Sequence, residues 1–475
     1  MGERAAELVG AVELGDARLN RRLEQFVEDL LAHPQATIPE ACGSWAATLA
    51  AYRLLENEAV TPEAIVAGVG QATVSRCPAA GVVLAIQDTT SVDYTGHRAT
   101  AGVGPLESPT HRGIVVHTTL AVTPDGTPVG VLDQQLWARD PAQLGRRHHR
   151  QATPVEGKES AKWLRALRAG LDRVGGHCAV VTVADREADI YEVFALAAEL
   201  AGDWVIRARH DRAQVDAAGS LERAVAASPV LATQEVDVAR KPTQAKRTAT
   251  VEVRAAQVRV GPPAGRGAAA KARWYAAHPA VELVGPADLD ALTLGVVCIT
   301  EPQPPSGERA VHWLLVTSLP VTTAAEALTC VHYYRLRWLI ERFHFVLKSG
   351  CQVEKLQLEH GDRLCRALAI YSVVAAWLLQ ATHRARTTPE APATTIMDGE
   401  AWRVLLSVHY PHQPLPAQPP TVRDAVRLVA RLGGFLGRAG DGEPGVTTIW
   451  RGFRRLTDLT LAWRIFTHVS TASLP

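Results

Sequence analysis

Three acidic residues occupy positions from which side chains can bind metal ions. Asp88 and Asp185 each come at the end of an apolar run of the buried-strand type, and Glu341 lies on the polar side of a helical pattern. Carboxylate oxygens suit hard divalent cations, and Mg²⁺ favours a sparse shell completed by water. Two such ions can activate a water or a 3′-hydroxyl at a phosphodiester. The three residues therefore predict a two-metal site, although large proteins also carry acidic residues at strand ends for other reasons.

The segment YYRLRWLIERFHFVLKSG (333–350) sets one of these carboxylates among cations. A single helix over 323–348 would place Tyr334, Arg337, Glu341 and Lys348 within roughly 60° of its circumference. The opposite side carries an apolar stripe suited to packing on a core, formed by Leu336, Leu339, Ile340, Phe343, Val346 and Leu347. The polar arc fits either a face that binds anions or a solvated face with an Arg337–Glu341 pair.

The first 75 residues have the pattern of short helices. Asp16 can cap the first, Thr37 and Glu40 form a capping-box pattern for a second that includes WAATLAAYRLL, and Pro62 suits the first turn of a third. Such a bundle suits DNA binding and equally suits a plain helical cap.

Strands and helices alternate in the following part of the chain. Residues 82–210 have the order β-β-β-α-β-α-β, which predicts a sheet of mixed direction with crossover helices. Residues from about 220 to 300 break this order, and the segment 234–263 within them alternates with period two, which predicts antiparallel strands. Nine basic residues and one acidic residue between 240 and 273 predict a basic patch there, with a solvated β-ribbon as the alternative. Residues 386–420 are proline-rich and predict a hinge before amphipathic helices in the tail.

The overall composition is that of a globular protein of several domains. The chain has 475 residues, 47% of them hydrophobic and 21% charged, with a net charge of +1, so a polyanion would have to bind through local patches. Seven scattered cysteines without a CxxC pair argue against disulfides and zinc and favour a reducing cytoplasm. The start lacks an apolar signal core, and the run 367–379 is too short to span a bilayer. We expect a soluble intracellular protein that binds no membrane.

Several motifs in one order resemble a known protein family. YYRLRWLIERFHFVLKSG has the Tyr-x2-Arg-x3-Glu-x6-Lys signature of the IS4 family of bacterial transposases. Further motifs that carry the resemblance along nearly the whole chain are LGDARLNRRL, AIQDTTS, KESAKWL, ADREADI, HWLLVTS and ARLGGF. The resemblance implies an α/β fold with an RNase H-like catalytic core, a β-rich insertion at about 220–305 and helical regions at both ends.

The resemblance also implies roles for single residues. Asp88, Asp185 and Glu341 become the DDE catalytic triad that holds two Mg²⁺ ions, for which Mn²⁺ is expected to substitute. The expected DNA contacts are Tyr334, Arg337, Lys348, Arg207, Trp313, on which a flipped base would stack, and His344, which either bonds DNA or supports its helix. One departure is Phe345, where a member of the family carries a lysine.

The expected function is therefore cut-and-paste DNA transposition. It proceeds by 3′-end nicking, hairpin formation, hairpin resolution and strand transfer, with a homodimer joining terminal inverted repeats to target DNA. Expected domains are an N-terminal DNA-binding domain (1–75), the catalytic domain (76–385) and a C-terminal, dimerising domain (386–475). The alternatives are a related two-metal nuclease that does not join DNA and a non-catalytic, DNA-binding inhibitor of transposition. The protein is expected in the bacterial cytoplasm, associated with the nucleoid when bound to DNA.

Overall fold

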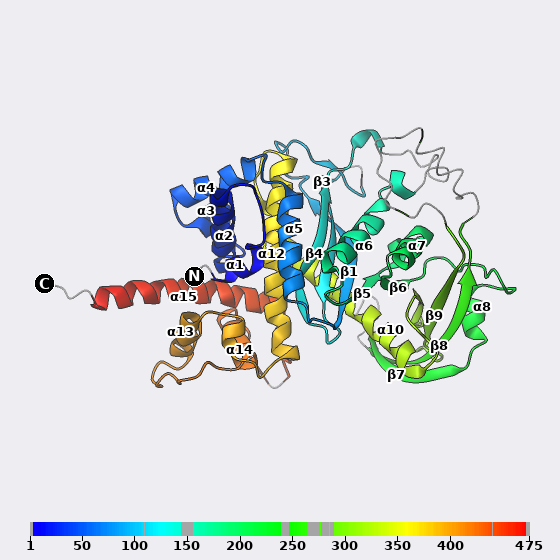
Figure 1. Cartoon of the computed structure of the whole chain (residues 1–475). Helices are drawn as coiled ribbons and strands as arrows, with labels where there is room; N and C mark the ends of the chain where they lie inside the picture. The colour runs from blue at the N-terminus through cyan, green and yellow to red at the C-terminus, as the bar shows by residue number, and fades with distance from the viewer. Residues whose placement is uncertain are drawn as a thin grey trace.

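A mixed sheet forms the centre of the molecule (Figure 1). The computed structural model describes residues 3–108, 110–143, 155–238, 247–263, 276, 285, 289–438 and 440–471. Within these residues, ten strands form one sheet in the order β2-β3-β1-β5-β6-β10-β9-β8-β7, with β4 paired to β3. The strands are β1 (Val82–Asp93), β2 (Gly104–Pro105), β3 (Arg112–Val122), β4 (Pro128–Trp137), β5 (Ala179–Ala184), β6 (Asp203–Arg207), β7 (Val230–Val238), β8 (Arg247–Val260), β9 (Leu292–Thr300) and β10 (His312–Thr317).

Strand β1 is buried on both sides, because helices cover both faces of the sheet. Val83 and Ala85 pack with residues of α5 (Pro62–Ser75) and α6 (Ala161–Val174), whereas Leu84 and Ile86 join the larger core that contains the opposite helices. Those helices are α10 (Ala324–Leu336), α11 (Trp338–Phe345) and α12 (Gly361–Thr387). Helix α7 (Tyr191–Glu199) leads into β6, so β1, β5 and β6 are parallel, as the crossover pattern predicts.

The predicted insertion does not form a separate sheet. Strands β7, β8 and β9 pair in antiparallel fashion with one another, and β9 pairs with β10, so they continue the central sheet. Helix α8 (Leu221–Ala226) packs on β8 and β9. The periodicity could indicate antiparallel strands but could not indicate which sheet edge they would join.

The predicted basic patch is balanced by acids from elsewhere in the sequence. Arg247 pairs with Glu301 and Glu308, and Arg259 lies 3.5 Å from Asp216. Arg254 pairs with Glu252. The other six basic residues counted there, namely Arg240, Lys241, Lys246, Arg266, Lys271 and Arg273, lie outside the described residues. The described part of the ribbon is therefore a set of ion pairs and not an open cationic surface.

The N-terminal helices begin close to the predicted caps. They are α1 (Glu3–Val9), α2 (Ala17–Ala32), α3 (Ile38–Cys42), α4 (Trp45–Glu56) and α5. Asp16, Thr37 and Thr61 each accept a hydrogen bond from the first turn of the following helix. The second predicted helix is in fact two, because Gly43 adopts a left-handed conformation (φ 65°) that ends α3.

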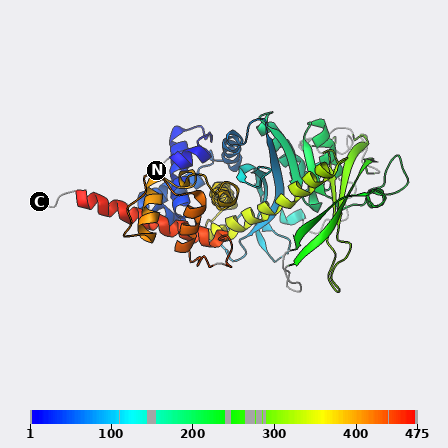
Figure 2. The same ribbon diagram turned by 90° about the horizontal axis from the view of Figure 1, so that it is seen from below.

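Helix α12 connects the regions of the molecule. It packs on β4 and on helices α2, α4, α5 and α14 (Val422–Leu432), and Figures 1 and 2 show it between the sheet and the terminal helices. In the described part of the chain it is the one helix long and apolar enough to cross a bilayer, yet 89% of its most apolar window is buried. It is the buried core helix that the run 367–379 predicts.

The C-terminal region is helical throughout most of its described length. Helix α13 (Gly399–His409) lies within the segment expected to be a hinge, and its Trp402 and Leu405 are buried, so that expectation is wrong for this part. Helices α14 and α15 (Val446–Thr471) match the predicted amphipathic tail. All seven cysteines are free, as their spacing predicts.

Arg366 attaches the N-terminal helices to α12. Its buried guanidinium donates from Nε to the carbonyl of Val60 (2.6 Å) and from Nη1 to that of Leu55 (3.0 Å). We expect Arg366→Met to lower the free energy of unfolding by about 3 kcal/mol, because two buried carbonyls lose a charged donor. Urea titration followed by circular dichroism measures this loss.

A matched control lies three residues earlier on the same helix. Arg363 makes partly exposed ion pairs with Glu56 and Glu359, so Arg363→Met should cost less than about 1 kcal/mol. Equal losses for the two variants would show that the buried bonds of Arg366 add nothing beyond surface charge.

Candidate active site

Parallel pairing aligns charged residues of three neighbouring strands, where β5 and β6 end. Asp88 does not end its strand as the sequence predicts, because β1 continues to Asp93 through its pairing with β3. The last paired residues of β1 and β5 are Ile86 and Val183, so Asp88 and Asp185 stand two residues further on at matching positions. The register of β5 with β6 places Arg207 level with Asp185. Adjacent strands lie about 4.8 Å apart. Residues distant in sequence thus become neighbours at one edge of the sheet.

The Asp88 side chain is largely buried, with 20% of it exposed against 57% for Glu341. Its Oδ1 accepts a hydrogen bond from the backbone N–H of Thr89 (2.8 Å), and Arg337 Nη1 lies 3.6 Å from its Oδ2. Burial, with smaller contributions from the negative charges of Asp185 and Glu341, raises the pKa of Asp88 to about 6 against the opposing effects of the Thr89 hydrogen bond and of Arg337. This electrostatic coupling places all three carboxylates in one neighbourhood.

Asp185 also shapes the chain that follows it. Its side chain accepts a hydrogen bond from the backbone N–H of Glu187 (2.9 Å) and so caps the short 3-10 helix η4 (Arg186–Ala188). The strand therefore ends at Asp185 in a tight turn, and the carboxylate stays at the edge of the sheet.

The helix that carries Glu341 is not the uniform one that the sequence predicts. Helix α10 ends at Leu336, Arg337 makes a tighter turn, α11 follows, and residues 346–350 form a π-helical turn, η5, closed by a bond from Cys351 N–H to the Val346 carbonyl (2.8 Å). An ideal 100° step per residue does not apply across these irregularities. The predicted arc is therefore wrong in detail, although Arg337 and Glu341 remain an i,i+4 pair.

Tyr334 lies inside and not on the polar face. Its ring is buried, packs edge-to-face with Trp313 at 5.5 Å between centroids, and has the Arg337 guanidinium 6.0 Å above it. Trp313 is only partly buried and lies on β10, which pairs with β6 beside Arg207. The buried Tyr334 ring therefore packs against Trp313 on one side and against the Arg337 guanidinium on another, and helps to hold both side chains in place.

The remaining candidates lie further along the same segment. Lys348 is on the π-helical turn and pairs with Glu354 at 3.4 Å. His344 is buried, which lowers its pKa to about 3, and this favours the role of supporting its helix over that of bonding DNA. Phe345 is 39% exposed and contacts Trp450 of α15.

The three carboxylates are of the right chemical type to bind a divalent cation, but their side chains are not placed to share one. Asp88, Asp185 and Glu341 offer only oxygen ligands, as Mg²⁺ and Mn²⁺ prefer. However, the Arg337 guanidinium lies between Asp88 and Glu341, and across the described ranges no three His, Cys, Asp or Glu side chains lie close enough to share a metal ion. The side chain of Glu341 is 57% exposed, so the residues fit a cation once the Arg337–Glu341 pair opens.

Comparison with known protein families agrees with this geometry. Residues 151–378 match the family described as the Transposase DDE domain, residues 1–60 match Transposase DNA-binding, and residues 373–469 match the Transposase Tn5 dimerisation domain. The three matches follow one another along the chain. The chain belongs to the Tn5-like DDE transposases of the IS4 family.

This DDE transposase is thus an enzyme that cleaves and joins DNA strands, as the sequence motifs predict. The expected fold class is also confirmed: an α/β core with the mixed sheet of an RNase H-like domain, flanked by helical regions. Members of this family use divalent metal ions. The DDE match contains Asp185 and Glu341 but begins after Asp88, so the strand register is what adds Asp88 to the site.

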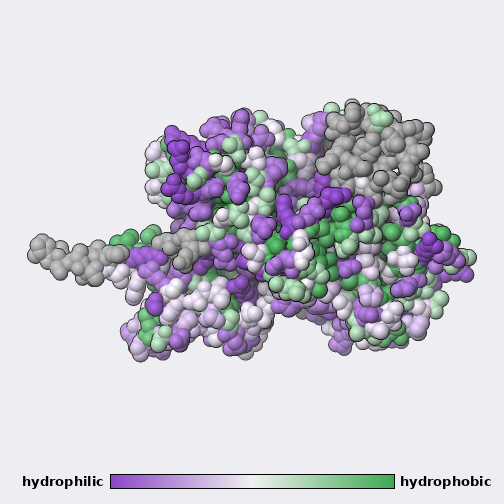
Figure 3. All heavy atoms as spheres, in the orientation of Figure 1, coloured by the Kyte–Doolittle hydropathy of each residue, from purple (hydrophilic) through white to green (hydrophobic). Residues whose placement is uncertain are grey.

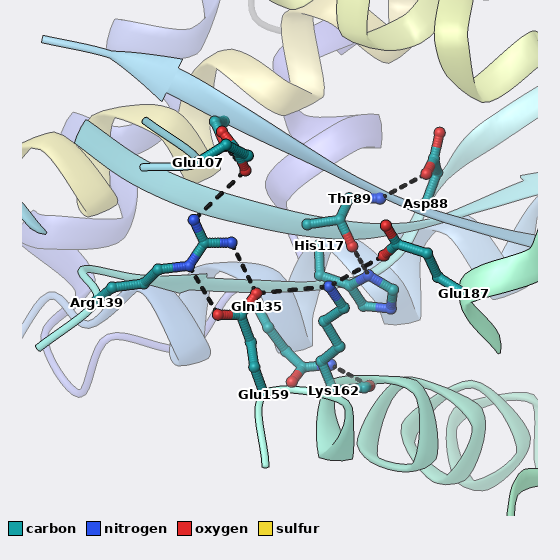
Figure 4. Close-up of polar contacts among 10 residues, drawn as sticks. Asp88, Thr89, Glu107, His117, Gln135, Arg139, Glu159, Lys162 and Glu187 are labelled. Carbon is teal, nitrogen blue, oxygen red and sulfur yellow. Dashed lines mark hydrogen bonds and ion pairs between the residues drawn. The ribbon is translucent and has the colours of Figure 1, made fainter. Parts of the chain in front are cut away.

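We call the edge of the sheet at Asp88, Asp185 and Glu341 the acidic edge. Sequence reasoning missed the polar residues behind it (Figure 4). Thr89 Oγ1 bonds Nδ1 of His117 (2.9 Å), and burial holds the pKa of that histidine far below its ordinary value. Lys162 lies beside them and pairs with Glu187. Lys162 and Glu187 were visible within the motifs KESAKWL and ADREADI, but nothing in their spacing showed that the fold would bring them together.

Proposed function

We propose that this transposase moves its element by cut and paste. A water attacks the phosphodiester at each element end and frees a 3′-hydroxyl, which then attacks the opposite strand and closes a hairpin. A second water opens the hairpin, and the 3′ ends join target DNA. Each step exchanges one phosphate ester bond for another or for a hydroxyl. The observation that carries the proposal is the matched register of Asp88 and Asp185 with Glu341 close by.

In this proposal Asp88, Asp185 and Glu341 hold two Mg²⁺ ions, for which Mn²⁺ can substitute. Bound there, the ions would activate the attacking oxygen and stabilise the leaving oxygen. Before DNA binds, Arg337 pairs with Asp88 and Glu341 and compensates part of their negative charge. When DNA binds, its guanidinium turns to a phosphate. Arg207 and Lys348 contact neighbouring phosphates, and Trp313 offers the exposed part of its ring to a flipped base.

The terminal regions supply recognition and pairing in the same proposal. Residues 1–75 read the terminal inverted repeats, 76–385 carry out the chemistry, and 386–475 join two copies. Helix α15 supports pairing, since Figure 3 shows hydrophobic residues on its protruding part and Leu461, Ile465 and Phe466 are more than half exposed. The enzyme would work in the bacterial cytoplasm, on the nucleoid.

A plasmid assay tests the reaction. A donor plasmid carries a marker between the inverted repeats that flank this gene, and a second plasmid serves as the target. With purified protein and Mg²⁺, we expect excised marker, hairpin-ended intermediates on denaturing gels, and insertions flanked by a short target duplication.

Other outcomes would assign a different activity. Excision without insertion would identify a nuclease that cannot join. Binding of the repeat ends without any nick in Mg²⁺ or Mn²⁺ would identify a non-catalytic, DNA-binding protein. Cleaved ends that never form a hairpin would overturn the proposed order of steps and leave the site assignment standing.

A further inference from the structure

A buried lysine lies beside the acidic edge, between two carboxylates. The side chain of Lys162 on α6 is 8% exposed, and its Nζ lies 3.7 Å from Glu159 Oε1 and 3.7 Å from Glu187 Oε2 (Figure 4). A buried ammonium needs such partners, because burial without compensation is costly. The ammonium thus joins α6 to η4, the turn that begins at Asp185.

The two carboxylates are held very differently. Glu159 is gripped by the fork of Arg139, with 2.7 Å from Nε and 2.8 Å from Nη2, and Arg139 also reaches Glu107 at 3.4 Å. Glu187 is 62% exposed and lies two residues from Asp185, whose carboxylate its backbone N–H holds. Removal of the lysine would leave Glu159 compensated by Arg139, so the charge set free would be that of Glu187.

A free Glu187 would stand next to an edge that already contains three carboxylates. A fourth negative charge there would repel the phosphates of DNA and would also repel the Asp185 carboxylate. The arrangement of α6 against η4 prevents this, since Lys162 draws the Glu187 side chain toward α6 and neutralises it.

We propose that Lys162 is a positioning residue of this transposase that acts through Glu187, by keeping a fourth carboxylate out of the catalytic edge. The inference rests on the proposed function, in which Asp185 and its two acidic neighbours meet DNA. It differs from a direct role, in which the ammonium of Lys162 would itself hold a phosphate. Charge removal at both members of the pair separates these two roles.

The test measures binding of the full chain to a duplex with the flanking inverted repeat, in EDTA, so that cleavage does not enter. We expect Lys162→Met to bind about tenfold more weakly, since one uncompensated charge faces the phosphates. Glu187→Gln should bind within about twofold of wild type. The double variant, whose net charge equals that of wild type, should return to within about threefold, because no unpaired carboxylate remains.

Controls and contrary results follow from the same series. Arg223→Met removes one positive charge from an exposed position on α8 and should change binding less than about twofold. Unchanged binding by Lys162→Met, or a double variant as weak as Lys162→Met, overturns the inference; the latter result assigns Lys162 to a phosphate. If Lys162→Met fails to fold, the double variant alone still separates the two roles: binding within about threefold of wild type supports a role through Glu187, and weak binding assigns Lys162 to a phosphate. A wild-type chain that binds but never cuts would defeat the proposed function and leave this comparison intact.

Discussion

Glu341→Gln is expected to abolish DNA cleavage while leaving the fold and DNA binding in place. The change removes the charge of one proposed metal ligand and keeps the shape of the side chain. Loss of several kcal/mol of transition-state stabilisation corresponds to a rate at least about 10³-fold lower. Binding of the repeat duplex in EDTA should stay within a fewfold of wild type, because Arg337 retains its partner Asp88. Nicking of an end-labelled duplex in Mg²⁺ measures the rate.

Glu199→Gln provides the matched control. Glu199 is an exposed glutamate at the end of α7, and its replacement makes the same chemical change outside the acidic edge. Its rate should equal that of wild type. A Glu341→Gln variant that nicked DNA at the wild-type rate would remove Glu341 from the site and with it the DDE assignment of this helix.

Asp88→Asn is expected to abolish cleavage by a similar factor and, unlike Glu341→Gln, to stabilise the protein at neutral pH. The pKa of Asp88 is about 6 in the folded chain, against an ordinary value of 3.8. The folded state therefore holds its proton more tightly than the unfolded state does, and stability falls as pH rises from about 4 through 6. Above that window the full cost is present, roughly 3 kcal/mol, and the neutral amide avoids it.

Chemical unfolding at pH 5, 7 and 8 measures this effect in metal-free buffer. The wild-type chain should lose stability relative to Asp88→Asn between pH 5 and pH 7, and the difference should then stay constant to pH 8. Asp185→Asn is the comparison, since its amide oxygen can still cap η4 and the change should not stabilise the protein. A wild-type chain at least as stable as Asp88→Asn at pH 8 would show that burial and the acidic neighbours do not destabilise the ionised Asp88 carboxylate.

Local patterns predicted the secondary structure well where one residue type decides the outcome. Asp16 and Thr61 cap helices as expected, because a side-chain acceptor at that position satisfies the same backbone donors in any fold. The break at Gly43 was missed, since the capping pattern and apolar spacing continue through it. The joining of β7–β9 to β10 was also missed, because period-two alternation carries no information about the partner strand.

The candidate site was predicted in its residues more than in its geometry. Asp88, Asp185 and Glu341 were named from strand ends, helix pattern and family motifs, and the register does place the two aspartates level. The sequence could not show that Tyr334 is buried, or that Arg337 lies between two of the carboxylates. These features depend on packing between α10, α11 and the sheet, which involves residues far apart in the chain.

The π-helical turn after α11 has a consequence for how this region tolerates change. A five-residue turn contains one residue more than an α-helical turn needs, so a single deletion between Val346 and Gly350 can be absorbed by reverting to an ordinary helix. Glu341 before the turn and the chain beyond it would keep their orientation, whereas Lys348 within the turn would change direction. At this turn the direction of one cation can therefore change without disturbing the three candidate carboxylates.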